Sequence, residues 1–176
     1  MTTRQANAWS RGLAAVAVML VVGACGGEGA TGPSAAPAAI KVVSGNNQTG
    51  TVGVALTTPL QVTVTAADGQ PVSNATVSWD VAPGSGMVST AATRTDGNGR
   101  TQVTWTLGAN AGVARLTAQV GGVNPAAFSA TAQPGALSLI VALPDTLGIG
   151  VGDTVSLTST ARDQFGNELN GTALTY

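Results

Sequence analysis

The chain of 176 residues is predicted to be all-β from residue 40 onward. Three observations support this. Apolar and polar residues alternate there in short runs, turn sequences rich in Gly, Asp and Asn separate the runs, and no stretch has a convincing helical period. Several short strands at this spacing are typical of a β-sandwich or a β-barrel.

The N-terminal residues have the order of a secretory signal. Arg4 and Arg11 precede an uninterrupted apolar segment at residues 13–22, and Gly23 and Ala24 follow it. A membrane-spanning helix needs about 20 apolar residues, and this segment is shorter. We therefore expect residues 1–24 to direct export and to be cleaved off.

The single cysteine of the chain follows this signal. Val22-Gly23-Ala24-Cys25 resembles the lipobox of bacterial lipoproteins, which implies cleavage between Ala24 and Cys25 and lipid attachment to the Cys25 thiol. Gly26 stands where inner-membrane lipoproteins often carry aspartate, so the resemblance implies the outer membrane or cell surface. Ordinary cleavage after Ala24 would instead leave a free thiol, and burial of Cys25 is disfavoured by its glycine-rich surroundings.

Composition narrows the classes of function. Removing residues 1–24 takes away two of the seven basic residues, Arg4 and Arg11, and leaves five against eight acidic residues. The resulting net charge of about −3 disfavours nucleic acid as a partner, because no basic patch faces phosphates. The chain also has no histidine and its acidic residues are scattered. We therefore expect no catalytic residues, no metal site and no cofactor, and so no enzyme.

A flexible linker is predicted at residues 25–39. Residues 26–39 contain four glycines and two prolines without a periodic apolar pattern, so they cannot bury enough surface to fold. Such a linker would let a folded domain stand off the membrane.

The next segment contains the predicted strands. Turn residues at 68–71, 83–86 and 96–99 separate runs in which one face is apolar. Trp79 and Trp105 are in phase with these faces, which favours core positions over a surface pair that stacks on carbohydrate. The apolar positions fall in four runs: Leu60, Val62, Val64 and Ala66; Val77, Trp79 and Val81; Val103, Trp105 and Leu107; Leu116, Ala118 and Val120.

The sequence Asp96-Gly97-Asn98-Gly99 has two interpretations. Its alternating oxygen-bearing residues resemble the start of a calcium-binding loop, but such a loop needs a Glu at its twelfth position, where Leu107 stands. A tight turn is therefore the favoured interpretation.

The chain also repeats itself. Residues 52–79 recur loosely as residues 151–176, at a spacing of about 95–99 residues, which is the length of one small β-sandwich. We align Asp68 with Asp163, Val72 with Leu169, Val77 with Leu174 and Trp79 with Tyr176. The sequence then predicts one antiparallel β-sandwich at residues 40–132 and an incomplete second repeat at 133–176. The side chains expected inside the sandwich are Leu60, Val62, Val64, Trp79, Val103, Trp105 and Leu116. Some inward positions of this repeat would be left partly exposed: Val155, Leu157, Leu174 and Tyr176.

Residues 93–122 resemble the bacterial immunoglobulin-like domain of the invasin and intimin group. The shared features are Thr95-Asp96 with Gly99 at a hairpin, the strand end at residues 105–108, Gly112 and Ala118. With Asp68-Gly69 and residues 77–79, the resemblance spans residues 40–132. It implies an immunoglobulin-like Greek-key β-sandwich without a disulfide, used in surface proteins as a spacer or adhesive module.

Together these features predict an exported, lipid-anchored, non-catalytic cell-surface protein that spaces or adheres. Its expected partners are the membrane, through the lipid on Cys25, and a protein or carbohydrate ligand at the surface. A domain with one specific carbohydrate or protein ligand is the alternative, and an exposed aromatic patch would favour it. A third class is an enzyme whose catalytic domain lies beyond Tyr176.

Overall fold

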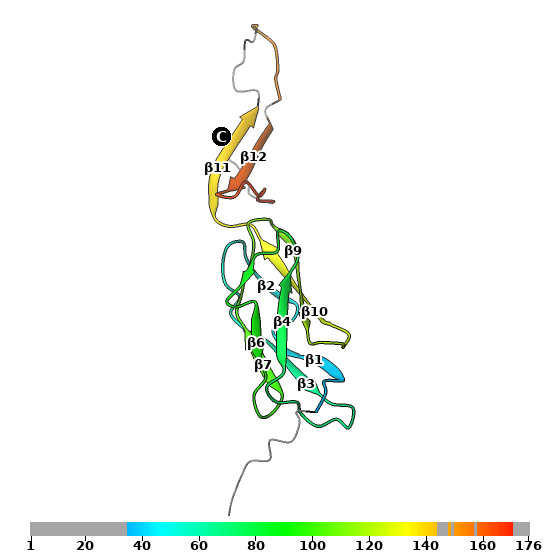
Figure 1. The fold of residues 1–176 in the computed structure, drawn as a ribbon. Helices are drawn as coiled ribbons and strands as arrows, with labels where there is room; N and C mark the ends of the chain where they lie inside the picture. The colour runs from blue at the N-terminus through cyan, green and yellow to red at the C-terminus, as the bar shows by residue number, and fades with distance from the viewer. Residues whose placement is uncertain (1–34, 144–147, 149, 157, 171–176) are drawn as a thin grey trace, which may run out of the picture. The chain divides into compact units, whose positions relative to one another are not determined.

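The structure is a computed structural model that describes residues 35–143, 148, 150–156 and 158–170 (Figure 1). The predicted signal and Cys25 lie outside the described residues. The described residues form strands and turns, and none of their segments is a helix long and apolar enough to cross a membrane. The strands are β1 (Ala39–Ser44), β2 (Gln48–Thr51), β3 (Leu60–Thr65), β4 (Thr76–Val81), β5 (Met87–Val88), β6 (Ala92–Arg94), β7 (Arg100–Val103), β8 (Trp105–Thr106), β9 (Gly112–Gln119), β10 (Ala126–Gln133), β11 (Leu137–Leu143) and β12 (Thr158–Asp163).

Two main sheets build the first domain. One has the strand order β1-β3-β7 and the other has the order β2-β10-β9-β4-β6, while β5 and β8 form a short pair. The chain crosses between the sheets after β3 and again after β6, and β9 lies between β4 and β10. This is the Greek-key connectivity of an immunoglobulin-like sandwich, so the predicted fold class is confirmed.

The edge of the larger sheet differs from the expectation of a wholly antiparallel sandwich. The consecutive strands β1 and β2 belong to different sheets. β1 pairs antiparallel with β3, whereas β2 pairs parallel with β10, with Gln48 opposite Ala130. Gly45 and Asn47 have positive φ between β1 and β2, where the chain switches sheets. The expectation was wrong at β2 because alternation in a sequence carries no information on strand direction.

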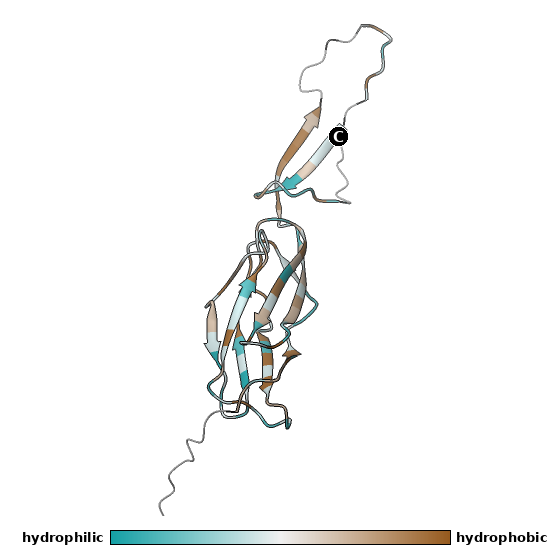
Figure 2. Ribbon diagram, turned by 45° about the vertical axis from the view of Figure 1, so that its right-hand side comes forward, coloured by the Kyte–Doolittle hydropathy of each residue, from teal (hydrophilic) through white to brown (hydrophobic). Residues whose placement is uncertain are grey.

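The core consists of apolar side chains from the inner faces of both sheets. The residues predicted to lie inside are all buried: Leu60, Val62, Val64, Trp79, Val103, Trp105 and Leu116. Figure 2 shows the alternation of apolar and polar residues along the strands of this domain. Alternate residues of β10 complete the core, although they are mostly small: Ala126, Phe128, Ala130 and Ala132.

Both buried indole rings have a partner for their N–H group. The Trp79 Nε1 donates to Thr93 Oγ1 at 2.8 Å, and the Trp105 Nε1 donates to the Ser85 carbonyl at 2.9 Å. The Trp79 ring also packs against Phe128, with 6.0 Å between the ring centroids. Each tryptophan thus joins an apolar contact to a directed hydrogen bond, which fixes its orientation in the core.

Close backbone packing surrounds the end of β8. A Cβ atom at Gly86 would lie 2.0 Å from the Thr106 carbonyl oxygen, and one at Gly108 would lie 2.1 Å from the Gly84 oxygen. Only glycine permits these approaches. The two glycines therefore let the 83–86 turn close over Trp105.

Beyond the first domain, β11 and β12 form an antiparallel pair. Unlike the strands of the sandwich, β11 exposes apolar side chains on both of its faces, and Figure 2 shows it as hydrophobic along most of its length. Its exposed large residues are Leu137, Leu139, Ile140 and Leu143. Val155, expected to be partly exposed, has an exposed fraction of 45%, whereas Leu157, Leu174 and Tyr176 lie outside the described residues.

Removing the Trp79 side chain tests its place in the core. Trp79→Ala should lower the free energy of unfolding by about 3–5 kcal/mol, because it leaves a cavity beside Phe128. Val113→Ala, on the exposed face of β9, should change it by no more than about 0.5 kcal/mol. Denaturant unfolding followed by far-ultraviolet circular dichroism measures both. An unchanged midpoint for Trp79→Ala would contradict its assignment to the core.

Candidate functional site

Two of the residues that the sequence singled out, Trp79 and Trp105, are among the described residues, and both are buried. Ala24 and Cys25 lie outside the described residues, and Trp79 and Trp105 are 3% and 1% exposed. The two tryptophans therefore do not form a surface pair on which a sugar could stack. In the described ranges, no group of three or more His, Cys, Asp or Glu residues is arranged to hold a metal ion.

The Asp96 segment forms a tight turn. The Asp96 Oδ1 accepts hydrogen bonds from the backbone N–H groups of Asn98 and Arg100, at 2.9 and 2.8 Å. Two backbone bonds close the turn, from the Asp96 N–H to the Arg100 oxygen and from the Gly99 N–H to the Asp96 oxygen. Gly99 has a φ of 70°, which a glycine adopts without strain. Asp96 therefore organises backbone amides here.

The same turn occurs at residues 163–167. The Asp163 Oδ1 accepts from the N–H groups of Phe165 and Asn167, both at 2.9 Å. The Asp163 N–H donates to the Asn167 oxygen, the Gly166 N–H donates to the Asp163 oxygen, and Gly166 has a positive φ. Each bond matches one in the Asp96 turn.

A third copy of this backbone turn lies at residues 66–70. The Ala66 N–H donates to the Gln70 oxygen, and the Gly69 N–H donates to the Ala66 oxygen. Its first position is Ala66, so it lacks the carboxylate that the other two turns share. Asp68 instead accepts a hydrogen bond from the Gln70 N–H.

The turns at 66–70 and 163–167 also occupy the same place relative to their strands. The Val72 N–H donates to the Val64 oxygen, and the Leu169 N–H donates to the Ala161 oxygen, a constant displacement of 97 residues. The β1–β3 and β11–β12 pairs are both antiparallel, with Ile40 opposite Val64 and Ile140 opposite Ala161, so the displacement is 97 residues between β3 and β12 but 100 residues between β1 and β11.

This register corrects one position of the sequence alignment. Asp163 corresponds to Ala66 rather than to Asp68, because the hydrogen bonds that close the two turns begin at Ala66 and at Asp163. The pairing of Val72 with Leu169 is consistent with the same register. The alignment failed at Asp68 because it matched two aspartates that occupy different positions of the turn.

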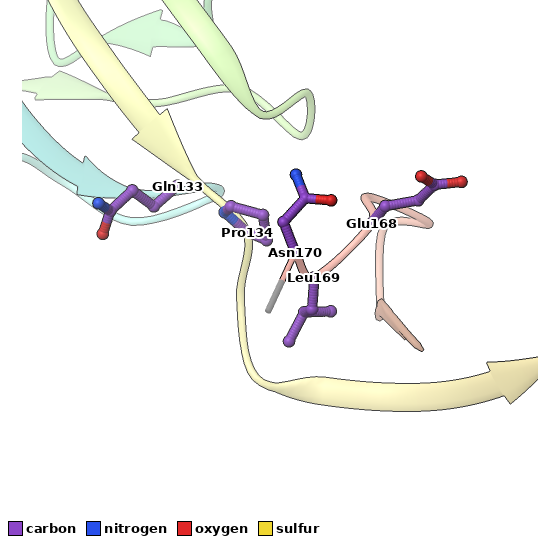
Figure 3. Close-up of a pocket in the computed structure, with 5 residues that line it drawn as sticks. All are labelled: Gln133, Pro134, Glu168, Leu169 and Asn170. Carbon is purple, nitrogen blue, oxygen red and sulfur yellow. The ribbon is translucent and has the colours of Figure 1, made fainter. Parts of the chain in front are cut away.

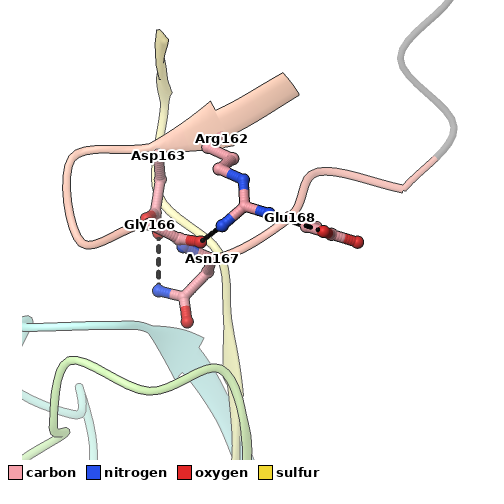
Figure 4. A network of polar contacts seen from close by, with 5 residues as sticks. All are labelled: Arg162, Asp163, Gly166, Asn167 and Glu168. Carbon is pink, nitrogen blue, oxygen red and sulfur yellow. Dashed lines mark hydrogen bonds and ion pairs between the residues drawn. The ribbon is translucent and has the colours of Figure 1, made fainter. Parts of the chain in front are cut away.

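The Asp163 carboxylate is the most heavily hydrogen-bonded acidic group of the described residues (Figure 4). Its Oδ2 accepts from the Gly135 N–H at 2.8 Å and from the Asn167 side-chain amide at 2.9 Å. Burial raises the pKa of this carboxyl, but the hydrogen bonds from Asn167, Gly135 and Phe165 outweigh that effect and lower the pKa from 3.8 to about 2. The group is therefore a carboxylate at neutral pH.

The turn at 163–167 also contacts the loops of the first domain. The Asn167 Nδ2 donates to the Ala109 oxygen at 2.7 Å, and the Asn167 Oδ1 accepts from the Ala111 N–H at 2.9 Å. The Phe165 ring lies against Gly53, since a Cβ atom there would be 3.0 Å from the Phe165 Cζ. Asn167 was not among the residues expected from the sequence to have a role. Its signal is the shared spacing of Asp and Gly in DGNGR and DQFGN.

A shallow hollow of about 300 Å³ adjoins this turn (Figure 3). It is lined by Gln133, Pro134, Glu168, Leu169 and Asn170. Nearby, Arg162 forms an ion pair with Glu168 at 2.9 Å, but both side chains are well exposed. Exposed pairs stabilise a fold only slightly. Neither feature brings together groups suited to chemistry.

No model of a known protein family matches the chain, and no curated protein sequence matches it. Among solved structures, the chain is similar to the FdeC adhesin of Escherichia coli, with a TM-score of 0.49 and 22% identity over 77% of this chain and 45% of that one. The D0-D1 domain of intimin has a TM-score of 0.41 and 20% identity over 72% of this chain and 65% of that one.

Domains 4 and 5 of the S-layer protein SbsC are also similar, with a TM-score of 0.43 and 16% identity over 55% of this chain and 52% of that one. The chain thus spans about half the length of the FdeC and SbsC chains. These scores and identities are low, and the assignment of the fold rests on the strand order described above.

The hydrogen bonds to Asp163 predict an unusual titration. Because its pKa is lowered in the folded protein, the carboxylate stabilises the fold at pH values above 3.8, and this contribution is lost as the pH falls through about 2. An NMR titration of the side-chain carboxyl carbon should give a midpoint near 2. A midpoint close to 3.8 would show that the hydrogen-bonded turn does not form in solution.

Proposed function

We propose that the chain is a non-catalytic, lipid-anchored protein of the cell surface, in which immunoglobulin-like modules arranged in series act as spacers or adhesive units. One observation carries the serial arrangement: the turn at residues 66–70 recurs 97 residues later with the same closing backbone hydrogen bonds, next to another antiparallel strand pair. Repetition at a fixed spacing is typical of proteins built from serial modules. Residues 133–176 then belong to a second module.

Spacing is favoured over recognition of a sugar by stacking. The three aromatic rings of the sandwich, Trp79, Trp105 and Phe128, are buried in its core. Phe165 is 44% exposed, and its ring lies against Gly53. The described surface therefore offers no pair of exposed rings as a platform for a carbohydrate. A ligand bound through other groups belongs to the adhesive version of the proposal.

The anchor is proposed from the sequence around Cys25. A lipobox-like order ends at this residue, and the 12 residues from Gly26 to Pro37, before Ala38 bonds to Thr65, have the composition of a flexible linker. A linker of this length has a root-mean-square span of about 20 Å. Such a span would keep the first module close to the membrane while leaving it free to turn.

Metabolic labelling with a fatty-acid analogue tests the anchor. The wild-type chain should incorporate the label and partition with membranes, whereas Cys25→Ser should lose both properties because no thiol remains to be acylated. Gly26→Ala is the matched control, since it changes the neighbouring residue and retains the thiol, and it should be labelled as the wild type is. Equal incorporation in the wild type and Cys25→Ser would refute lipid attachment at this residue.

A further inference from the structure

We propose that residues 163–167 form a joint that fixes the segment containing β11 and β12 on the first module. The contact surface on the first module consists of Gly53 and the backbone of Ala109 and Ala111. This inference goes beyond the proposed function, because the joint would form whether or not Cys25 carries a lipid.

Comparing the three copies of the turn shows which hydrogen bonds close the turn and which occur only in the joint. All three share the same closing backbone bonds and a glycine of positive φ. The Asp96 turn shows that one carboxylate oxygen suffices to organise the backbone amides. In the Asp163 turn the second oxygen binds Gly135 and Asn167 in addition. Neither bond is part of the basic turn: the Gly135 bond connects the turn to the segment between β10 and β11, and the Asn167 bond orients the Asn167 side chain.

The Asn167 carboxamide has the donors and the acceptor that the joint requires. One Nδ2 proton reaches the Ala109 oxygen, the other reaches the Asp163 carboxylate, and the Oδ1 accepts from Ala111. Both donors and one acceptor position of the carboxamide are therefore used. An aspartate at this position would lack both donors, and a glutamine would place the same group one methylene farther away.

Asp163 also supports the contact between Asn167 and the first module. Its carboxylate orients the Asn167 amide and also holds the Gly135 N–H. Gly135 lies in the three-residue connection, residues 134–136, between β10 and β11. The carboxylate thus ties the connection to the turn, and the turn reaches the loops of the first module. Pro134 restricts the backbone of the same connection further.

The first module carries different residues at the corresponding positions. Ala66 replaces the aspartate and Gln70 replaces the asparagine. This module follows the predicted linker of residues 25–39 rather than another module. We infer that an Asp and an Asn, four residues apart, mark a module that docks on the one before it.

Hydrogen exchange of the Ala111 N–H tests the joint in the full chain. Asn167→Ala removes the acceptor of this N–H, so its exchange should become about five- to tenfold faster, as expected for the loss of one hydrogen bond. Gln70→Ala is the matched control at the corresponding position of the first module and should leave Ala111 unchanged. NMR detection resolves this single amide.

Three results would overturn the proposal. The first is unchanged exchange at Ala111 in Asn167→Ala, and the second is the same acceleration in Gln70→Ala. The third is a loss of protection throughout β3 and β9 in Asn167→Ala, because the joint contacts only loop backbone and its removal should leave the sandwich intact. Asn167→Gln should accelerate Ala111 as Asn167→Ala does, since the longer side chain displaces the carboxamide.

Discussion

The burial of two indole rings between facing sheets is the constraint on which the rest of the structure depends. Trp79 and Trp105 have the largest side chains in the core, and each is oriented by a hydrogen bond. The chain has only one cysteine, so an intramolecular disulfide cannot hold the two sheets together. Packing must do so instead, with the alternating residues of both sheets filling the space around the rings.

This core also positions the loops that meet the second segment. The Leu56 N–H donates to the Trp105 oxygen, and the Gly53 N–H donates to the Gly108 oxygen. The loop after β2 is therefore tied to the backbone that carries the buried Trp105. These bonds attach the surface formed by Gly53 and the neighbouring backbone of Ala109 and Ala111 to the core. A segment that contacts this surface is therefore connected to the sandwich.

Local sequence patterns predicted much of the sandwich. The runs that contain Leu60, Trp79 and Trp105 could be placed because a strand with one buried face has a period of two residues. The pairing of β2 with β10 could not be placed, because alternation does not encode direction. The strand β10 escaped notice because its inward residues are mostly alanines, which give little contrast with its polar positions.

The joint was harder to foresee than the core. The contacts of Asn167 with Ala109 and Ala111 span 58 and 56 residues, so no local spacing reveals them. The alignment of Asp68 with Asp163 matched residue types and concealed that the turn begins at Ala66. Only the hydrogen bonds show that one turn is used three times, and that its copy at residues 163–167 carries a side chain that contacts another segment.

Residual dipolar couplings test most directly the claim that the two segments form one rigid unit. The backbone N–H couplings of residues 39–133 and of β11, β12 and the 163–167 turn should fit a single alignment tensor, because the joint fixes their relative orientation. Two tensors of different magnitude, one for each segment, would contradict the account and would mean that the connection at residues 134–136 is flexible.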